Sequence, residues 1–273
     1  MSLLEIRHLQ LKFYDTQPPL EVVKDISFAM KEGEILGIVG ESGSGKTQTA
    51  LSVLGLLKKH EEISAGEILF EGKNLAEFSQ KELEAVRGKD ISMIFQEPMT
   101  SLNPVLPVGQ QVEEGLRLHT SYTKEECKKR ALDMLREVEL AEVENIYNRY
   151  PHQLSGGMRQ RIMIAAALVT EPKLLIADEP TTALDVTIQS QILKLLKKIN
   201  EKHHTGILFI SHDLGVIRRL CDRVIVMNQG KIVEMGTVEE IFQEPRQEYT
   251  KKLLAAVPTR GESLRRGKGG EAQ

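Results

Sequence analysis

The segment Gly40–Thr47 constrains the fold of this chain more than any other stretch of its sequence. It matches the pattern Gly-x-x-x-x-Gly-Lys-Ser/Thr, in which glycines let backbone N–H groups wrap closely around a polyphosphate. An apolar run precedes it, and apolar residues at helical spacing follow it through Leu57, which predicts a buried strand and then a helix. The positive N-terminus of that helix would face the anion. We therefore interpret the segment as a phosphate-binding loop rather than a flexible Gly/Ser linker, with Lys46 reaching the outer phosphates.

The composition is that of an ordinary soluble protein. The 273 residues, of which 27% are charged and 41% hydrophobic, suit one large domain or a domain with a subdomain. The net charge of −3 argues against a general affinity for nucleic acid or anionic membranes. No stretch approaches the ~18 consecutive apolar residues of a membrane span, and the opening residues do not resemble a signal peptide. Cys127 and Cys221 lie far apart and are expected to be free thiols in a reducing compartment.

Apolar patterning predicts an α/β fold with added parts. Alternating apolar residues up to about Met30 predict antiparallel strands, and the middle of the chain is predicted to be more helical, with capping boxes at Ser79 and Thr123. The rest alternates apolar strands with helices, which is typical of a parallel sheet covered on both faces. Ligands bind at the carboxyl ends of such strands. The phosphate-binding loop and the segments 177–179 and 211–213 are therefore expected to converge on one site.

Asp178 and Glu179 directly follow an apolar strand pattern. Charges at a strand end are common, but beside a phosphate-binding loop they indicate a specific chemistry. The first carboxylate can hold Mg²⁺ together with phosphate oxygens, and the second can orient or deprotonate a water that attacks the terminal phosphate. His203 and His204, by contrast, end a helix pattern in polar surroundings. They are expected to be solvated rather than to bind a metal.

A second anion-binding pattern begins at Leu154. The sequence LSGGMRQR places paired glycines before an apolar helix pattern, which alone is more often a capped turn. Because it lies between the phosphate-binding loop and the carboxylate strand, the chain resembles the ATP-binding cassette family, the ATPases of ABC transporters, over about residues 3–258. The family's motifs occur in order as Walker A (Gly40–Thr47), Q-loop (Gln96), signature (Leu154–Gln160), Walker B (Leu174–Glu179), D-loop (Ala183–Asp185) and H-loop (His212).

The resemblance implies a P-loop NTPase fold of ABC type over residues 1–258. Such a fold has a mainly parallel core sheet with helices on both faces, an N-terminal antiparallel β-subdomain and a helical signature subdomain, here at about 97–170. Residues 259–273 are expected to form a polar C-terminal tail.

The resemblance also implies a set of site residues. The catalytic residues would be Glu179, His212 and Gln96, and the Mg²⁺ ligands would be Thr47, Gln96 and Asp178. Either Phe13 or Tyr14 would stack on adenine, although Phe13 fits the core equally well. The other contacts to ATP would come from Gly40, Glu41, Ser42, Gly43, Ser44, Gly45, Lys46, Thr47 and Gln48. The contacts across to a second cassette would be Leu154, Ser155, Gly156, Gly157 and Gln160 in the signature and Ala183, Leu184 and Asp185 in the D-loop.

Two segments narrow the resemblance. Met93–Val112 and Glu244–Pro258 are similar to the peptide and nickel importer group, the ATPases of oligopeptide, dipeptide and nickel permeases. Many peptide-type members continue with a cysteine-bearing extension, and no cysteine follows Cys221 here, which keeps a nickel-type subunit open. The resemblance therefore implies an ATP-hydrolysing importer subunit with ATP and Mg²⁺ as cofactors, peripheral at the cytoplasmic face of the cell membrane. Its implied partners are a second cassette, identical or different, two membrane permease subunits and, indirectly, an extracytoplasmic solute-binding protein, without nucleic acid.

Other ATPases with a similar signature fit less well. A chromosome-maintenance or repair ATPase would have a long coiled coil between Lys46 and Ser155, where no heptads persist, and a translation-associated member would carry two cassettes in one chain.

The segment Gln96–Val108 is a candidate contact with a membrane subunit. It contains three prolines and the apolar residues Met99, Leu102, Val105 and Leu106, which follow no clear period. We expect some of these side chains to be exposed and to dock a cytoplasmic helix of a permease. The alternative is an ordinary loop beside the active site.

Overall fold

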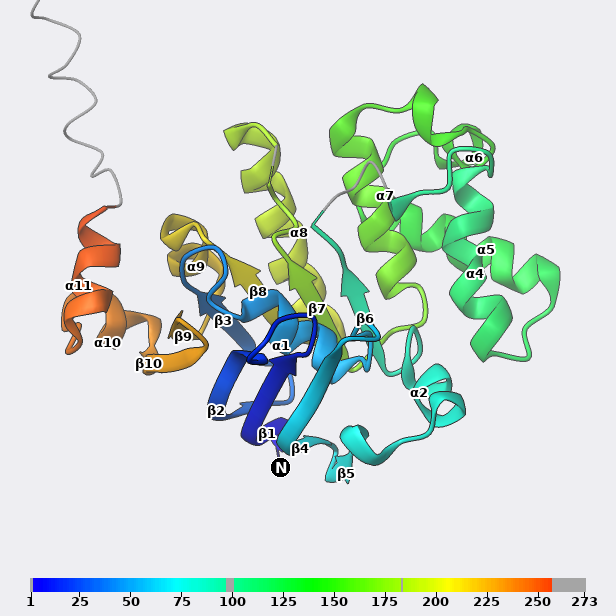
Figure 1. Cartoon of the computed structure of the whole chain (residues 1–273). Coiled ribbons are helices and arrows are strands. Elements are labelled where there is room, and N and C mark those ends of the chain that lie inside the picture. Colours follow the sequence, from blue (N-terminus) through cyan, green and yellow to red (C-terminus); the bar gives the residue numbers. More distant parts are fainter. Residues whose placement is uncertain (1, 97–100, 183, 257–273) are drawn as a thin grey trace, which may run out of the picture.

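The strands form two β-sheets within residues 2–96, 101–182 and 184–256, which the computed structural model describes (Figure 1). The smaller sheet has the strand order β2 (Leu20–Lys31), β1 (Ser2–Phe13), β4 (Glu61–Phe70) and β5 (Lys73–Asn74). The larger sheet has the order β10 (Lys231–Thr237), β9 (Arg223–Asn228), β3 (Ile35–Val39), β8 (Gly206–Ser211), β7 (Leu174–Asp178) and β6 (Ile91–Ile94). The helices are α1 (Lys46–Val53), α2 (Gln80–Val86), α4 (Val108–His119), α5 (Lys124–Glu137), α6 (Val143–Tyr147), α7 (Gly156–Leu168), α8 (Val186–His203), α9 (Leu214–Leu220), α10 (Val238–Gln243) and α11 (Glu248–Ala255), with short 3₁₀ turns η1 (Leu75–Glu77) and η2 (Pro151–Gln153).

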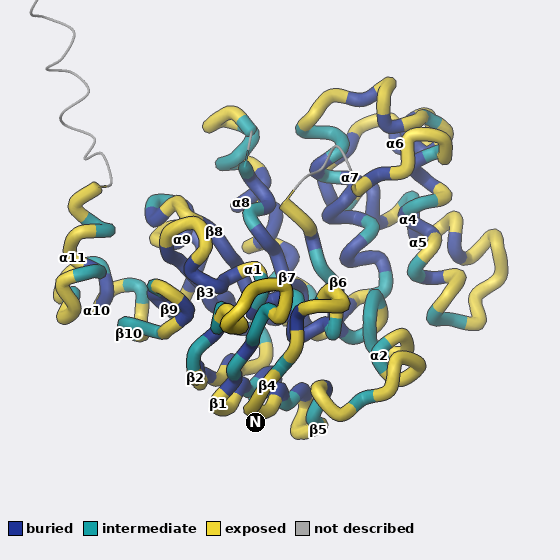
Figure 2. Tube along the Cα trace, in the orientation of Figure 1, coloured by how far each residue is buried: buried dark blue, intermediate teal, exposed yellow. Residues whose placement is uncertain are grey.

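The larger sheet is parallel except at one edge. β3 pairs in parallel with β8 and β9, and β7 pairs in parallel with β6 and β8, whereas β10 runs antiparallel to β9. Successive strand residues point to opposite faces, so Ile35 and Val39 join one hydrophobic core while Leu36 and Ile38 join another. The central strands β3, β7 and β8 are accordingly buried along their length, whereas the edge strand β10 is partly exposed (Figure 2). This arrangement confirms the predicted α/β sheet with both faces covered.

Each face of the larger sheet has its own core. The smaller sheet covers one face through side chains such as Leu4, Phe28 and Phe70. Its antiparallel pairing, with Ile6 opposite both Phe28 and Ile68, confirms the strands predicted for the beginning of the chain. Side chains of α4 to α9 fill the core on the other face. The phosphate-binding loop follows β3, a strand that contributes to both cores, so its position is set by packing on two sides.

The helices α4 to α7 lie next to β6, on the side of the molecule away from α10 and α11 (Figure 1). Both predicted capping boxes are confirmed: Ser79 caps α2 and Thr123 caps α5, each accepting a bond from the backbone of the Glu three residues later. These helices, from Val108 to Leu168, fall inside the region expected to be helical. The boundaries of a subdomain at about 97–170 remain a prediction.

The helix after the phosphate-binding loop is shorter than predicted. We expected it to reach Leu57, but α1 ends at Val53. Gly55 has a φ of 59°, a left-handed conformation that ends helices and that a side chain would disfavour. Leu57 instead packs from outside the helix, partly buried, against the core that also holds Leu54.

The prediction for the histidine pair is wrong for one of its members. His204 is exposed at the end of α8, as expected, but His203 is partly buried. The His203 Nε2 atom lies 2.6 Å from Oε1 of Glu137, at the end of α5, and Lys202 contacts the same carboxylate. The sequence could not indicate this pair because its partners are far apart in the chain. No helix in the described residues is long and apolar enough to cross a membrane, and both cysteines are free and buried.

Candidate nucleotide-binding and catalytic site

The phosphate-binding loop needs glycine at two positions for different reasons. Gly45, the N-cap of α1, has a φ of 97°, which side-chain-bearing residues rarely adopt. Gly40 is crowded: a Cβ atom there would lie 2.1 Å from the backbone oxygen of Met227 in β9. The loop therefore passes beside Met227 of β9 and leads into the start of α1.

Lys46 lies inside the loop. Its Nζ atom donates to the backbone oxygens of Gly40 and Glu41, both at 2.9 Å, and the side chain is only 6% exposed. Burial lowers the pKa of Lys46, while the charges of Glu179 and Asp178 act in the opposite direction. A cation held in this way is oriented before any anion arrives.

Asp178 is the last residue of β7 and is 2% exposed. Burial raises its pKa, and the Thr47 side chain lowers it by hydrogen bonding. Its Oδ1 atom has no hydrogen-bond partner among the described residues. A buried carboxylate oxygen without a partner, beside Thr47 in the first turn of α1, is suited to a hard cation.

Glu179 is held by side chains from the ends of three neighbouring strands. His212, after β8, places Nδ1 3.0 Å from Oε1 of Glu179. Gln96, after β6, donates from Nε2 to Oε2 at 3.0 Å, and Thr182 donates to the same oxygen at 2.9 Å. The Glu179 N–H bonds the oxygen of Ile210 in β8 at 2.9 Å. The segments expected to meet at the carboxyl ends of the strands do come together here.

The backbone and the charge of Glu179 are both unusual. Its φ is 47°, a left-handed conformation that a non-glycine residue keeps only when its surroundings enforce it. Burial favours the neutral acid, but the bonds from His212 and Thr182 outweigh it and hold the pKa of Glu179 below its ordinary value. The structure thus favours a charged carboxylate in a fixed orientation.

Thr182 is a site residue that our sequence analysis missed. A hydroxyl three residues after a carboxylate can bond back to it across a turn, and the N–H of Thr182 also bonds the Glu179 oxygen at 3.1 Å. The sequence pattern Glu-Pro-Thr-Thr contained this signal.

The signature segment begins a helix, and its side chains divide into two groups. Ser155 caps α7, with its hydroxyl accepting from the N–H of Met158 at 3.3 Å, and nothing lies within 4 Å of a Cβ placed on Gly156. Leu154 and Gln160, which we expected to contact a second cassette, are buried within this chain at 4% and 0% exposure. Those two side chains must be removed from the predicted contact set because they point into their own cassette.

For the predicted D-loop residues and adenine-stacking rings, the structure gives positions that do not test the predicted roles. In the D-loop, Leu184 packs against the core and Asp185 caps α8 through the N–H of Ile188, while Ala183 lies outside the described residues. Phe13 packs against the core and lies edge-on to the ring of His60, with centroids 6.0 Å apart. Tyr14 is 49% exposed. The stacking of either ring on adenine remains a prediction.

The segment Gln96–Val108, our candidate contact with a permease, is only partly exposed among its described residues. Val105 and Leu106 are 75% and 41% exposed, but Leu102 is buried at 5% in the core shared with α4 to α7. Leu102 therefore has a packing role, which corrects the expectation that it contacts a permease. Met99 lies outside the described residues.

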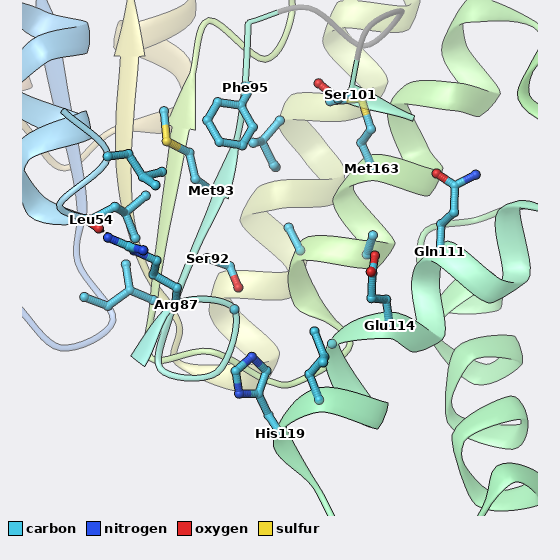
Figure 3. Close-up of a pocket in the computed structure, with 18 of the residues that line it drawn as sticks. Leu54, Arg87, Ser92, Met93, Phe95, Ser101, Gln111, Glu114, His119 and Met163 are labelled. Atoms are coloured by element: carbon cyan, nitrogen blue, oxygen red, sulfur yellow. The ribbon is translucent and has the colours of Figure 1, made fainter. Parts of the chain in front are cut away.

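A cavity of about 420 Å³ opens between β6 and the helices α4 and α7 (Figure 3). Met93, Phe95 and Met163 line it with apolar surface, and Glu114 and His119 of α4 stand at its polar side. Phe95 directly precedes Gln96, so the residue that bonds Glu179 is adjacent in the chain to the wall of this cavity.

Comparisons with known proteins agree with this geometry. Residues 23–182 match the family model described as ABC transporter. The chain is 52% identical over 258 residues to the oligopeptide transport ATP-binding protein OppD of Bacillus subtilis (strain 168), covering 94% of this chain and 72% of that protein. It is 49% identical to the glutathione import ATP-binding protein GsiA of Escherichia coli O157:H7, covering 95% of this chain and 43% of that protein.

Solved structures are similar over most of the chain. One is the dimeric structure of a post-hydrolysis state of the ATP-binding cassette MJ0796 bound to ADP and Pi, with a TM-score of 0.77, 31% identity and coverage of 86% of this chain and 98% of that one. Another is cbiO1 from Clostridium perfringens, part of the ABC transporter complex cbiONQ, with a TM-score of 0.77, 30% identity and coverage of 97% and 99%. Sequence, fold and site lead to one conclusion: this chain is a member of the ABC transporter family, as an ATP-binding cassette.

Proposed function

We propose that this cassette hydrolyses ATP to power the uptake of peptides through a multi-subunit importer. The observation that carries the proposal is the fixed, charged Glu179, which directly follows β7. Peptides are favoured as the solute because OppD and AppD of Bacillus subtilis are named as oligopeptide transport proteins, at 52% and 49% identity. Because those names do not mention nickel, nickel uptake is the alternative that the experiment below also measures.

The chain's own groups suit phosphoryl transfer to water. Lys46 and the loop N–H groups would bind the phosphates, and Glu179 would orient the attacking water and accept its proton. His212 and Thr182 keep that carboxylate charged and in place. Asp178, Thr47 and Gln96 would hold Mg²⁺, and the unpartnered Oδ1 of Asp178 supports this assignment. The metal would supply positive charge to the phosphate oxygens.

One chain carries only half of each site in this proposal. Ser155, Gly156 and Gly157 begin α7, a helix of 13 residues whose N-terminus attracts anions. They would bind the terminal phosphate of ATP held by a second cassette, and the dimeric structures of MJ0796 support such a pairing. The second cassette is either another copy of this chain or a paralogue.

The cavity of Figure 3 and the exposed residues Val105 and Leu106 would receive a short cytoplasmic helix of one permease subunit. Exposed apolar side chains beside an open cavity suit an amphipathic helix. Gln96 would then transmit the state of Glu179 to the permease contact. The chain would lie peripherally at the cytoplasmic face of the membrane. It would meet the extracytoplasmic solute-binding protein only through the permeases, and no nucleic acid. We propose residues 1–258 as the cassette, with a helical subdomain at about 97–170, and 259–273 as a tail outside the described residues.

Solute uptake tests this proposal against a non-transport role in chromosome maintenance, repair or translation. A strain that lacks this chain and its paralogues should lose the uptake of labelled di- and oligopeptides. The wild-type chain, alone or together with its paralogue, should restore uptake, and Lys46→Ala under the same conditions should not. Loss of nickel uptake alone would replace the peptide by nickel. Wild-type uptake of both solutes would overturn the importer function.

A further inference from the structure

The C-terminal part of the cassette touches the phosphate-binding loop at separate points. Gly230, in the turn between β9 and β10, donates its N–H to the backbone oxygen of Ser44 at 3.1 Å and accepts from the N–H of Lys24 at 2.7 Å. Met227 closes off the space beside Gly40. These contacts use only backbone atoms, and they hold the phosphate-binding loop on the side that faces β9 and the turn after it.

A side chain of α11 adds a contact of another kind. The hydroxyl oxygen of Tyr249 accepts a hydrogen bond from the N–H of Glu41 at 3.3 Å. Its ring is half-buried and packs, with Leu253 and Leu254, against the core on the helical face of the sheet. Burial also raises the pKa of Tyr249, so the phenol stays neutral at physiological pH.

The start of α11 is anchored independently. The carboxylate of Glu234, in β10, accepts from the N–H of Arg246 at 2.7 Å and from the N–H of Gln247 at 3.2 Å. Tyr249 follows these residues within one helical turn. Its hydroxyl is thus held against the loop by packing against the core and by Glu234 of the edge strand β10.

The contact falls on the peptide group that orients the loop lysine. The Gly40 oxygen, which accepts from Lys46 Nζ at 2.9 Å, and the Glu41 N–H, which bonds Tyr249, belong to the same peptide group. Because a peptide group is planar and rigid, Tyr249 fixes one end and Lys46 the other. A rotation of this group would move an acceptor away from Lys46.

We propose that Tyr249 is a positioning residue for the phosphate-binding loop, holding the Gly40–Glu41 peptide so that Lys46 is oriented before ATP binds. The inference rests on the proposed function. Its consequence is selective: the hydroxyl contributes to nucleotide affinity, since it organises the empty loop, and contributes little to the chemical step at Glu179.

Tyr249→Phe tests this because it keeps the ring and removes the acceptor. A single neutral hydrogen bond corresponds to a change of about three- to tenfold in affinity. We expect the Kd and the KM for ATP to rise by about that factor, with kcat within about twofold of wild type. Tyr122→Phe is the matched control: Tyr122 precedes α5, its ring lies against Arg130, and its loss of a hydroxyl should change neither constant.

The possible results distinguish a failure of the positioning role of Tyr249 from a failure of the proposed function. Equal ATP affinity for wild type and Tyr249→Phe would overturn the positioning role, and so would a lowered unfolding temperature without any change in Kd. A wild-type chain that neither binds nor hydrolyses ATP would overturn the proposed function instead. Tyr249→Leu, which also removes ring packing, should weaken ATP binding at least as much as Tyr249→Phe, and a weaker effect would contradict the assignment.

Discussion

Glu179→Gln removes one charge from the site while leaving its shape. Oε1 of Glu179 faces His212 Nδ1, whereas Oε2 accepts from the donors of Thr182 and Gln96. An amide can keep its oxygen toward Thr182 and Gln96 and turn its NH₂ toward His212, which accepts in its neutral form. The substituted side chain should therefore stay in place, and the change isolates the loss of the base.

The expected magnitude follows from that isolation. Removing a positioned base lowers turnover by about 10²–10⁴-fold, or about 3–5 kcal/mol in the activation barrier. Binding should persist, since Lys46 keeps its bonds to the loop and loses a competing negative neighbour. We therefore expect Glu179→Gln to bind ATP as tightly as wild type or more tightly.

Phosphate release and ATP affinity, measured on the same preparations, check both parts. Glu201→Gln, an exposed carboxylate of α8, is the control and should leave both values unchanged. Turnover of Glu179→Gln within about tenfold of wild type would refute the reasoning. A loss of ATP binding equal to the loss of turnover would refute it as well.

Three further predictions concern charge, assembly and docking. Thr182→Val removes a bond that lowers the pKa of Glu179, so the activity lost as pH falls should be lost at a higher pH than in wild type; an unchanged pH profile would contradict this. ATP should make Glu179→Gln assemble into dimers in light scattering, alone or with a paralogue, and no association in either case would argue against the two-cassette site. Val105→Asp should abolish uptake and leave the unfolding temperature unchanged, because Val105 is exposed. Leu102→Asp should lower the free energy of unfolding by ~3 kcal/mol or more, because it buries a charge. Calorimetry that gives the two variants equal stabilities would contradict the docking role of Val105 and the packing role of Leu102.

Structural features that depend on short sequence patterns could be predicted from the sequence. The strands β3, β7 and β8 are continuous apolar runs because both of their faces are buried. The capping boxes at Ser79 and Thr123 depend only on neighbouring residues, and the loop glycines follow a short local pattern. These patterns were sufficient for the fold class and for the convergence of the strand ends.

Features that depend on distant packing were not predictable. Tyr249 bonds a residue 208 positions earlier, and His203 pairs with Glu137 on a different helix. Leu102 lies in a segment without any period, so its burial is decided by the helices around it. Gln160 continues the signature pattern, yet helical geometry turns its side chain inward. For Tyr249, His203 and Leu102, residues far along the chain determine the outcome.

Peptide uptake by cells that carry only Glu179→Gln tests the central claim, that hydrolysis at this carboxylate drives transport. The variant should be expressed at the wild-type level and should bind ATP, so any defect reports the chemical step. We expect labelled oligopeptide to enter cells with the wild-type chain and to remain outside cells with Glu179→Gln. Uptake at the wild-type rate in the variant would contradict the account.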